Sequence, residues 1–174
     1  IDDLLIISNG SLEDHLDKVG KVLKKLHAAG FKVNAEKSFF ARNELEYLGF
    51  KITRDGIMPL PKKVEAIKNI AVPTTKKQLR SFIGLINYYR DMWQHRSGIL
   101  TPLSSMTSKQ AKWNWDDKCQ QAFDTIKKLV ARKTLLSYPN FNEPFDIHTD
   151  ASKLQLGAVI SQEGKPIAFY SRKL

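Results

Sequence analysis

Apolar residues recur every three or four positions along much of the chain, which is the spacing of a helix with one buried face. This spacing predicts a helix over residues 12–29, between a capping serine and a terminating glycine. Further helices are predicted from Pro61, after the Thr74-Thr75 pair, within residues 97–106 and after Asp116. The single cysteine, Cys119, falls on the apolar face of the last helix, and we expect it to be a core residue.

Other stretches have the pattern of extended chain. Residues 1–8 place a purely apolar run behind two acids and before Asn-Gly, which predicts a buried strand that ends in a tight turn. A short extended piece is predicted for residues 31–38. Two strands that turn at Arg42-Asn43 are predicted within residues 39–53, and a further extended piece is predicted for residues 57–60.

The pattern changes again after Pro144. Residues 145–150, 157–161 and 167–171 are each typical of a strand, and Glu163-Gly164 lies in the predicted hairpin turn between the last two. Helices in the middle of the chain and strands at both ends together predict an α+β fold.

Charge is spread unevenly over the 174 residues, whose formal net charge is +10. Residues 61–113 hold 10 Lys or Arg against two Asp or Glu, whereas the segments on either side are nearly neutral. A basic segment of this kind is typical of a surface that lies on a phosphate backbone. The alternative is a basic surface that only keeps the protein soluble.

Asp2 and Asp3 are the first candidates for chemistry. Two carboxylates at the end of a strand suit a hard divalent cation such as Mg²⁺, which prefers oxygen ligands. Neighbouring side chains of a strand point to opposite faces, so both acids can face one ion only if the backbone bends there. The alternative is a surface turn with two solvated acids.

The ends of the chain and its apolar segments limit its class. The chain lacks an initiator methionine, and residues 1–8 and 168–174 both have a strand pattern, so we expect a piece of a longer protein. No apolar stretch approaches the roughly 20 residues that span a bilayer, and no membrane partner is expected.

The motifs, in their order, resemble the polymerase–RNase H region of gypsy-type LTR-retrotransposon reverse transcriptases, part of the Pol polyprotein. Matching segments run from Ile1-Asp2-Asp3-Leu4-Leu5 through Tyr47-Leu48-Gly49-Phe50 and the helix of residues 79–90 to Phe145–Ser152. The match covers essentially the whole chain, although residues 91–96 are more polar than is usual in the family. The resemblance implies a partial palm (1–60), a helical thumb (61–112), a connection (113–143) and the first strands of an RNase H-like α/β domain (144–174).

The resemblance also implies roles for individual residues. Asp2, Asp3 and Asp150 are expected to be catalytic carboxylates that hold Mg²⁺ or Mn²⁺, and Lys37 is expected to lie near the triphosphate of an incoming nucleotide. The residues expected to contact nucleic acid are Leu48 and Gly49, in a primer-gripping hairpin, and the basic residues Lys62, Lys63, Lys68, Lys76, Lys77 and Arg80. The alternatives are a solvated lysine for Lys37 and an aspartate that caps a turn for Asp150.

The expected function follows from the same resemblance. The parent enzyme would copy retrotransposon RNA into DNA by two-metal nucleotidyl transfer and would cleave the RNA of a hybrid. Its partners would be the RNA/DNA template-primer duplex, deoxynucleoside triphosphates and the remainder of the Pol polyprotein, in a cytoplasmic virus-like particle or the nucleus. Both sites need residues that the chain lacks, so we expect it to be inactive alone. The alternative is a non-catalytic nucleic-acid-binding remnant of a degraded or domesticated retroelement.

Overall fold

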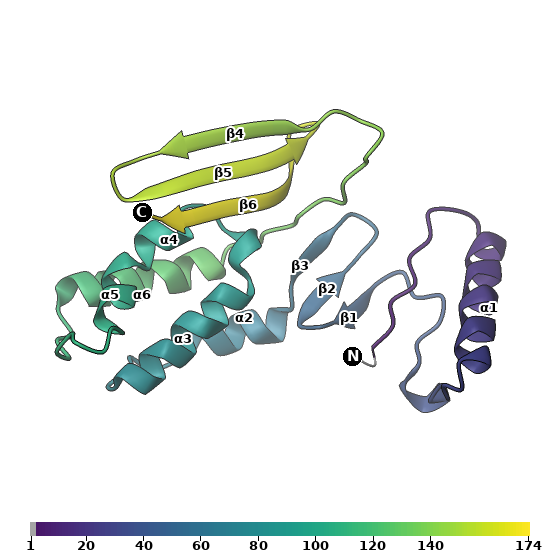
Figure 1. Cartoon of the computed structure of the whole chain (residues 1–174), viewed down its shortest axis with the longest axis horizontal. Coiled ribbons are helices and arrows are strands. Elements are labelled where there is room, and N and C mark those ends of the chain that lie inside the picture. Colours follow the sequence, from purple (N-terminus) through teal and green to yellow (C-terminus); the bar gives the residue numbers. More distant parts are fainter. Residues whose placement is uncertain (1–2) are drawn as a thin grey trace.

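The computed structural model describes residues 3–174 and has an α+β fold, as predicted (Figure 1). Two antiparallel three-stranded sheets, in the strand orders β1-β2-β3 and β4-β5-β6, lie before and after a group of helices. The helices are α1 (Leu12–Ala28), η1 (Ala35–Lys37), α2 (Pro61–Lys68), α3 (Lys76–Tyr88), η2 (Arg90–Met92), α4 (Arg96–Ile99), α5 (Thr101–Met106) and α6 (Asp117–Val130). The strands are β1 (Leu45–Tyr47), β2 (Phe50–Ile52), β3 (Ile57–Pro59), β4 (Asp146–Ala151), β5 (Gln155–Gln162) and β6 (Lys165–Lys173).

The helical body consists of α2, α3, α5 and α6, and its apolar faces share one core. Ile67, Leu79 and Ile126 are fully buried there, and the rings of Phe82 and Phe123 lie 4.7 Å apart between α3 and α6. These are the residues whose helical spacing predicted the elements, because a stripe of apolar side chains is stable only against another apolar surface. No helix among residues 3–174 is both long and apolar enough to cross a bilayer.

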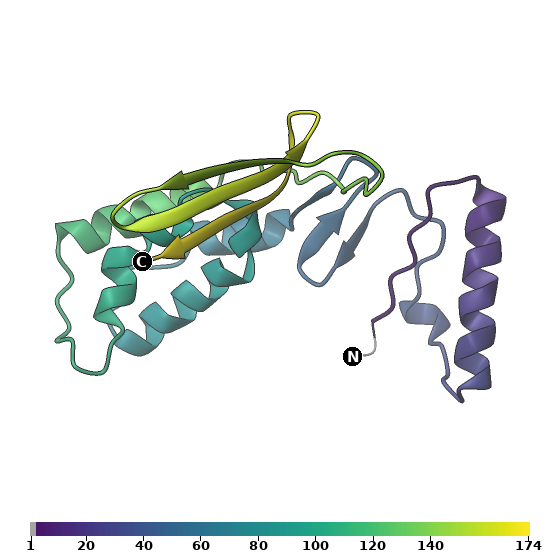
Figure 2. The same cartoon turned by 45° about the horizontal axis from the view of Figure 1, so that its top comes forward.

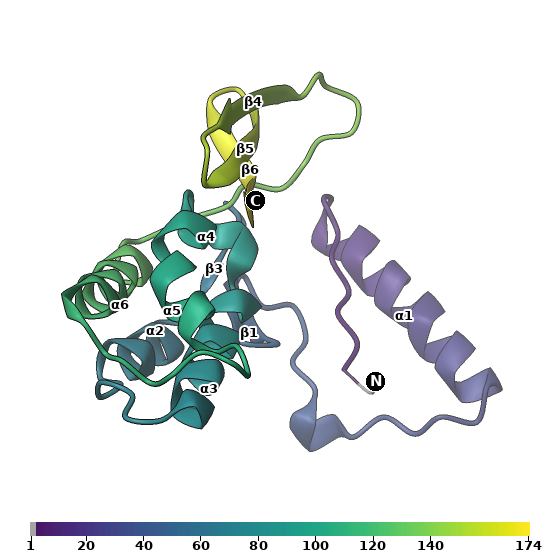
Figure 3. The same ribbon diagram turned by 60° about the vertical axis from the view of Figure 1, so that its left-hand side comes forward.

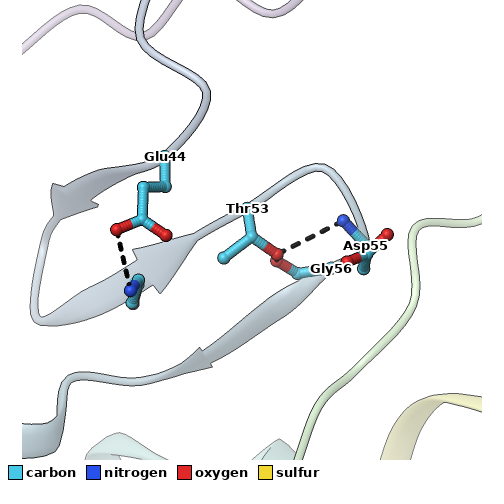
Figure 4. Close-up of polar contacts among 5 residues, drawn as sticks. Glu44, Thr53, Asp55 and Gly56 are labelled. Atoms are coloured by element: carbon cyan, nitrogen blue, oxygen red, sulfur yellow. Dashed lines mark hydrogen bonds and ion pairs between the residues drawn. The ribbon is translucent and has the colours of Figure 1, made fainter.

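The first sheet is fixed to the chain that follows α6. Ile57 and Leu136 exchange two main-chain hydrogen bonds, of 2.8 and 2.9 Å, which add one bridge to the edge of β3. Gly56 lies at this contact with a φ of +148°, and a Cβ atom there would lie 2.1 Å from the Leu136 carbonyl oxygen. The turn before it is closed by Thr53, whose hydroxyl donates to the Gly56 carbonyl and accepts from the Asp55 amide (Figure 4). This turn separates β2 from β3.

The second sheet lies over the helices, next to α4 (Figures 1 and 2). Its strand β6 contacts η2 and α4. The Ser97 amide donates to the Ser171 hydroxyl at 2.9 Å, and the Gly98 amide donates to the Gln155 side chain at 2.7 Å. These bonds join α4 to β5 and β6, so the sheet is anchored by polar contacts at this seam. The three strands predicted after Pro144 are confirmed, and β5 and β6 are both longer than predicted.

The helix predicted over residues 12–29 is confirmed as α1, which begins with a capping box between Ser11 and Asp14. It stands apart from the helical body and both sheets (Figure 3). Its apolar face is largely exposed, since Val19 is its one buried residue while Leu12 and Leu16 are 61% and 53% exposed. The period of apolar residues thus predicted α1 correctly, but few residues of the described chain pack against its apolar face.

The strand predicted for residues 1–8 is not present in its described part. Residues 3–8 are irregular, and Leu4 and Ile7 are more than half exposed. A strand needs a neighbour to pair its N–H and C=O groups, and residues 3–8 pair with neither sheet of residues 3–174. Residues 1 and 2 lie outside the described residues.

Two local predictions between residues 31 and 53 are also corrected. The piece predicted to be extended over residues 31–38 contains the 3₁₀ turn η1, because the Asn34 side chain accepts from the amides of Glu36 and Lys37. The hairpin turn predicted at Arg42-Asn43 lies instead at Leu48-Gly49, between β1 and β2. Both strands are three residues long and begin after residue 44.

Candidate nucleic-acid interface

The two-residue turn at Leu48-Gly49 is the best-defined part of the interface. Tyr47 and Phe50 pair across the hairpin, and both turn residues have positive φ, of +44° and +76°. This combination matches the twist of a two-stranded hairpin and is normally reserved for Asn and Gly. Leu48 has an uncommon backbone conformation for its residue type, and its side chain is 55% exposed at the tip. The turn therefore presents the apolar side chain of Leu48 to solvent.

Two tyrosines at the end of α3 hold this turn in place. The Tyr88 hydroxyl donates to the Leu48 carbonyl at 2.5 Å, and the Tyr89 hydroxyl donates to the Gly49 carbonyl at 2.9 Å. The Gly49 carbonyl also accepts from the Leu60 amide at 3.1 Å. The carbonyls of the hairpin tip are thus anchored to the helical body, which fixes the tip relative to α3.

Aromatic packing supports the same contact. The Phe50 ring lies stacked at 5.7 Å from Tyr88 and edge-on at 5.2 Å from Tyr89. Tyr89 is only 2% exposed, and burial raises the pKa of its hydroxyl, which remains a hydrogen-bond donor at neutral pH. The role of this pair was not predicted from the sequence, although a Tyr-Tyr dipeptide at the end of an amphipathic helix was a usable signal.

The basic residues of α2 are exposed, and two of them are already paired. Lys62 contacts Glu46 at 2.5 Å, and Lys68 contacts Glu65 at 2.7 Å, both between exposed side chains. The Lys62 contact lies in a cleft of about 380 Å³, whose wall also includes Glu44 and Lys51, an ion pair of 2.9 Å (Figure 4). Exposed pairs of this kind are weak, so a phosphate can compete for the lysines.

Lys63 and Lys77 are exposed and have no polar side-chain partner within residues 3–174. They are the two members of the predicted nucleic-acid-binding set whose side chains have no polar partner among the described residues. Their contact with nucleic acid stays a prediction.

Lys76 and Arg80 have a structural role that the sequence did not indicate. Lys76 donates to the carbonyls of Ser108 and Ala111 at 2.7 and 2.5 Å, and Arg80 donates to the Thr107 carbonyl at 2.7 Å. These bonds tie α3 to the chain that leaves α5, since the carbonyls at a helix end need donors. A phosphate contact by either residue stays a prediction, and it would have to replace or share these bonds.

The predicted catalytic residues are dispersed. Lys37 lies exposed in η1, Asp3 lies exposed before α1, and Asp150 lies exposed on β4, opposite Gly157 of β5. Asp2 lies outside the described residues. The Tyr47 hydroxyl donates to the main-chain carbonyl of Asp3 at 3.3 Å, which links this segment to the first sheet.

A divalent metal needs several oxygen ligands. No group of three His, Cys, Asp or Glu side chains suited to a metal ion occurs among the described residues. The described residues therefore supply single carboxylates and no complete metal centre.

Both ends of the chain match known protein families. Residues 1–52 match the family described as reverse transcriptase (RNA-dependent DNA polymerase), and residues 115–174 match the RNase H-like domain found in reverse transcriptase. The hairpin tip lies near the end of the first matched segment, and α6 lies in the second. The Tyr88-Tyr89 pair and helices α2, α3 and α5 lie between the two segments.

Whole-chain relatives agree with this assignment. The chain is 40% identical over 175 residues to the retrovirus-related Pol polyprotein from transposon 297 of Drosophila melanogaster, and 36% identical over 186 residues to that from transposon gypsy of the same species. These alignments include 100% of the chain but only 16% and 18% of the respective relatives, so the chain spans less than a fifth of either.

Solved structures show the same arrangement. A foamy viral protease-reverse transcriptase in complex with an RNA/DNA hybrid is 29% identical, with a TM-score of 0.83 over 96% of this chain and 23% of the other. A foamy viral protease-reverse transcriptase in complex with dsDNA gives a TM-score of 0.82 at 29% identity, over 96% of this chain and 36% of the other.

Proposed function

Because the chain belongs to the reverse transcriptase and RNase H-like region of retrotransposon Pol polyproteins, we propose that it is the part of an RNA-directed DNA polymerase that holds the template-primer duplex. The observation that carries the proposal is the Leu48-Gly49 tip, exposed on one side and anchored by Tyr88 and Tyr89 on the other. An anchored tip can approach a strand closely without having to become ordered on binding, which lowers the entropic cost of association. Solved relatives in complex with an RNA/DNA hybrid and with dsDNA support the same ligand.

The basic residues of the helical body are proposed to contact the phosphates of this duplex. Lys62, Lys63, Lys68 and Lys77 lie exposed on α2 and α3, and α2 directly follows the hairpin sheet. Phosphate contacts position a protein on a duplex but carry no sequence information. We therefore expect binding without sequence preference.

In the parent enzyme we propose catalytic roles for Asp2, Asp3, Lys37 and Asp150. Enzymes of both matched families generally depend on divalent metals, and carboxylates suit Mg²⁺ or Mn²⁺. The described residues do not complete such a centre, so the remaining ligands would come from other parts of the Pol polyprotein. Deoxynucleoside triphosphates are proposed as substrates, with Lys37 near the triphosphate, and a virus-like particle or the nucleus as the location.

Salt-dependent binding tests the proposal. Fluorescence anisotropy of a labelled RNA/DNA hybrid would be recorded with the 174-residue chain between 50 and 200 mM salt. Four phosphate contacts give a slope of log K against log salt of about −3.6, so the affinity should fall roughly 150-fold over this range. Absence of binding at 50 mM salt, or a flat slope, would contradict the proposal.

Two double variants test whether binding depends on the lysines of the helical body or only on the net charge of the chain. Lys63→Met/Lys77→Met should reduce the magnitude of the slope by about 1.8, because two phosphate contacts are lost. Lys18→Met/Lys24→Met removes the same charge from exposed positions of α1 and should leave the slope unchanged. Equal effects of both pairs would show that only net charge matters.

Catalysis is tested separately from binding. We expect no primer extension by this chain with Mg²⁺ or Mn²⁺, because its described carboxylates do not form a metal centre. Nucleotide incorporation by the purified chain would refute this expectation.

A further inference from the structure

A second basic site lies where the helical body meets the second sheet. It is a cleft of about 300 Å³ between η2, the start of α4 and β6, and it is lined by Arg90, Asp91, Arg96, Tyr170, Ser171 and Arg172. Three guanidinium groups face one carboxylate there, so the cleft has an excess of positive charge. It is separate from the hairpin tip and from the lysines of α2.

Arg96 is the unusual member of this group. Its side chain is only 9% exposed, and its one hydrogen bond within residues 3–174 goes from Nη1 to the Asn87 side-chain oxygen. The Nε atom is buried without a partner, and no carboxylate among the described residues forms an ion pair with this guanidinium. An arginine has five N–H donors and stays charged at neutral pH, so most of its bonding capacity is unused.

The one acid in the cleft does not neutralise Arg96. The Asp91 carboxylate contacts the Arg90 Nε atom at 3.6 Å, and both of these side chains are more than 60% exposed. Burial lowers the pKa of Arg96, while Asp91 opposes this shift only through its charge. A buried cation without a paired anion is costly to the fold, so an anion in the cleft would be strongly favoured.

The walls of the cleft are held rigidly. Ser171, in its floor, accepts from the Ser97 amide at 2.9 Å, and the hydroxyls of these two serines lie 2.6 Å apart. Gln155 of β5 accepts from both Ser97 and Gly98, which fixes α4 against the sheet. Arg96 and Arg172 are therefore presented from two elements whose separation is set before any ligand arrives.

We propose that this cleft binds a phosphate group of the nucleic-acid backbone, with Arg96 at its base and Arg90 and Arg172 at its rim. Guanidinium groups match phosphate oxygens with paired hydrogen bonds, which a single lysine cannot do. The choice of nucleic acid as the source of the phosphate rests on the proposed function. The site would give the duplex a contact at the junction with the second sheet, in addition to the contacts of α2 and α3.

The test uses the 174-residue chain and the same RNA/DNA hybrid titration. Arg96→Met and Arg172→Met should each weaken binding about five-fold or more and reduce the magnitude of the salt slope by about 0.9, the value for one phosphate. Arg132→Met removes an equal charge from an exposed position that does not line the cleft, and it should bind like the unaltered chain. If Arg96→Met does not fold, Arg172→Met still tests the proposed phosphate site, because Arg172 is exposed.

Inorganic phosphate provides an independent readout. Phosphate at ten times its Kd should raise the Tm of the unaltered chain by about 3–5 °C relative to chloride of equal ionic strength, and it should raise that of Arg172→Met by about half as much or less.

The two readouts separate failure of the inference from failure of the proposed function. Salt-dependent hybrid binding that neither cleft variant alters would overturn the inference and leave the proposed function intact. Stabilisation by phosphate through Arg172, in a chain that does not bind the hybrid, would support a phosphate site and reject the proposed function.

Discussion

The contact between Tyr89 and the hairpin tip makes a quantitative prediction about stability. Tyr89→Phe removes only the hydroxyl, which is buried and donates to the Gly49 carbonyl at 2.9 Å. A hydrogen bond of this kind contributes about 0.5–1.5 kcal/mol to stability. The Gly49 carbonyl keeps its bond from the Leu60 amide, so it is not left unsatisfied. We therefore expect a loss of about 1 kcal/mol, or roughly 2–4 °C in Tm for a chain of this size.

Two further tyrosine variants serve as comparisons for the loss of stability expected of Tyr89→Phe. Tyr88→Phe removes a shorter bond, but Tyr88 is 53% exposed, and water can replace its hydroxyl, so we expect a loss of less than about 0.5 kcal/mol. Tyr170→Phe is the control, because the Tyr170 hydroxyl has no hydrogen-bond partner within residues 3–174 and its side chain is 52% exposed. The order of stability loss should be Tyr89, then Tyr88, then Tyr170.

Urea unfolding measures the loss of global stability, and amide hydrogen exchange measures the local loosening of the hairpin. The midpoint of unfolding should fall for Tyr89→Phe while the m-value stays constant. Exchange of the Phe50 and Leu60 amides should accelerate more than exchange in α6, because the bond holds the tip locally. Unchanged exchange at the hairpin, together with an unchanged midpoint, would refute the conclusion that Tyr89 anchors it.

Three further predictions concern other parts of the chain. Gly56→Ala places a Cβ atom 2.1 Å from the Leu136 carbonyl oxygen at a φ of +148°, so it should separate β3 from the chain after α6. Urea unfolding should show a loss of stability of about 3 kcal/mol. Unchanged stability would contradict the contact between Gly56 and Leu136. Burial raises the pKa of the Cys119 thiol, so iodoacetamide at pH 8 should label the unfolded chain at least ten times faster than the native one, as followed by mass spectrometry. The Asp116 carboxylate accepts from the Cys119 amide at 2.9 Å, and this bond lowers its pKa below 3.8. The stabilisation by this hydrogen bond is therefore present above pH 4 and is lost as the pH falls through the lowered pKa of Asp116. Asp116→Asn should lower the unfolding midpoint more at pH 7 than at pH 3.

The helices were predictable because their signals are local. Caps, prolines and a period of 3.6 residues lie within each segment, and these gave both bounds of α1 and the starts of α2, α3 and α6 close to those observed. The strands of the second sheet were predictable for a similar reason, since β4, β5 and β6 follow one another and pair with their neighbours in sequence.

The hairpin turn was misplaced because its residues give a poor local signal. Arg42-Asn43 has typical turn chemistry, whereas Leu48 adopts a positive φ that its residue type disfavours. The conformation is stabilised from outside the hairpin, by the hydroxyls of Tyr88 and Tyr89, 40 residues away along the chain. Tertiary contacts of this kind override local preference and are not visible in a sequence pattern.

The amino-acid sequence by itself determined the helices, the basic middle segment and the order of motifs that places the chain in its family. Only the tertiary structure decided which charges are available, since Lys76 and Arg80 bond to main-chain carbonyls while Lys63 and Lys77 remain exposed. It also showed that Arg96 is buried and has no counter-ion among residues 3–174. The physical reason is that composition fixes how many charges a chain carries, whereas pairing and desolvation, which set what each charge can bind, depend on distances between residues far apart in sequence.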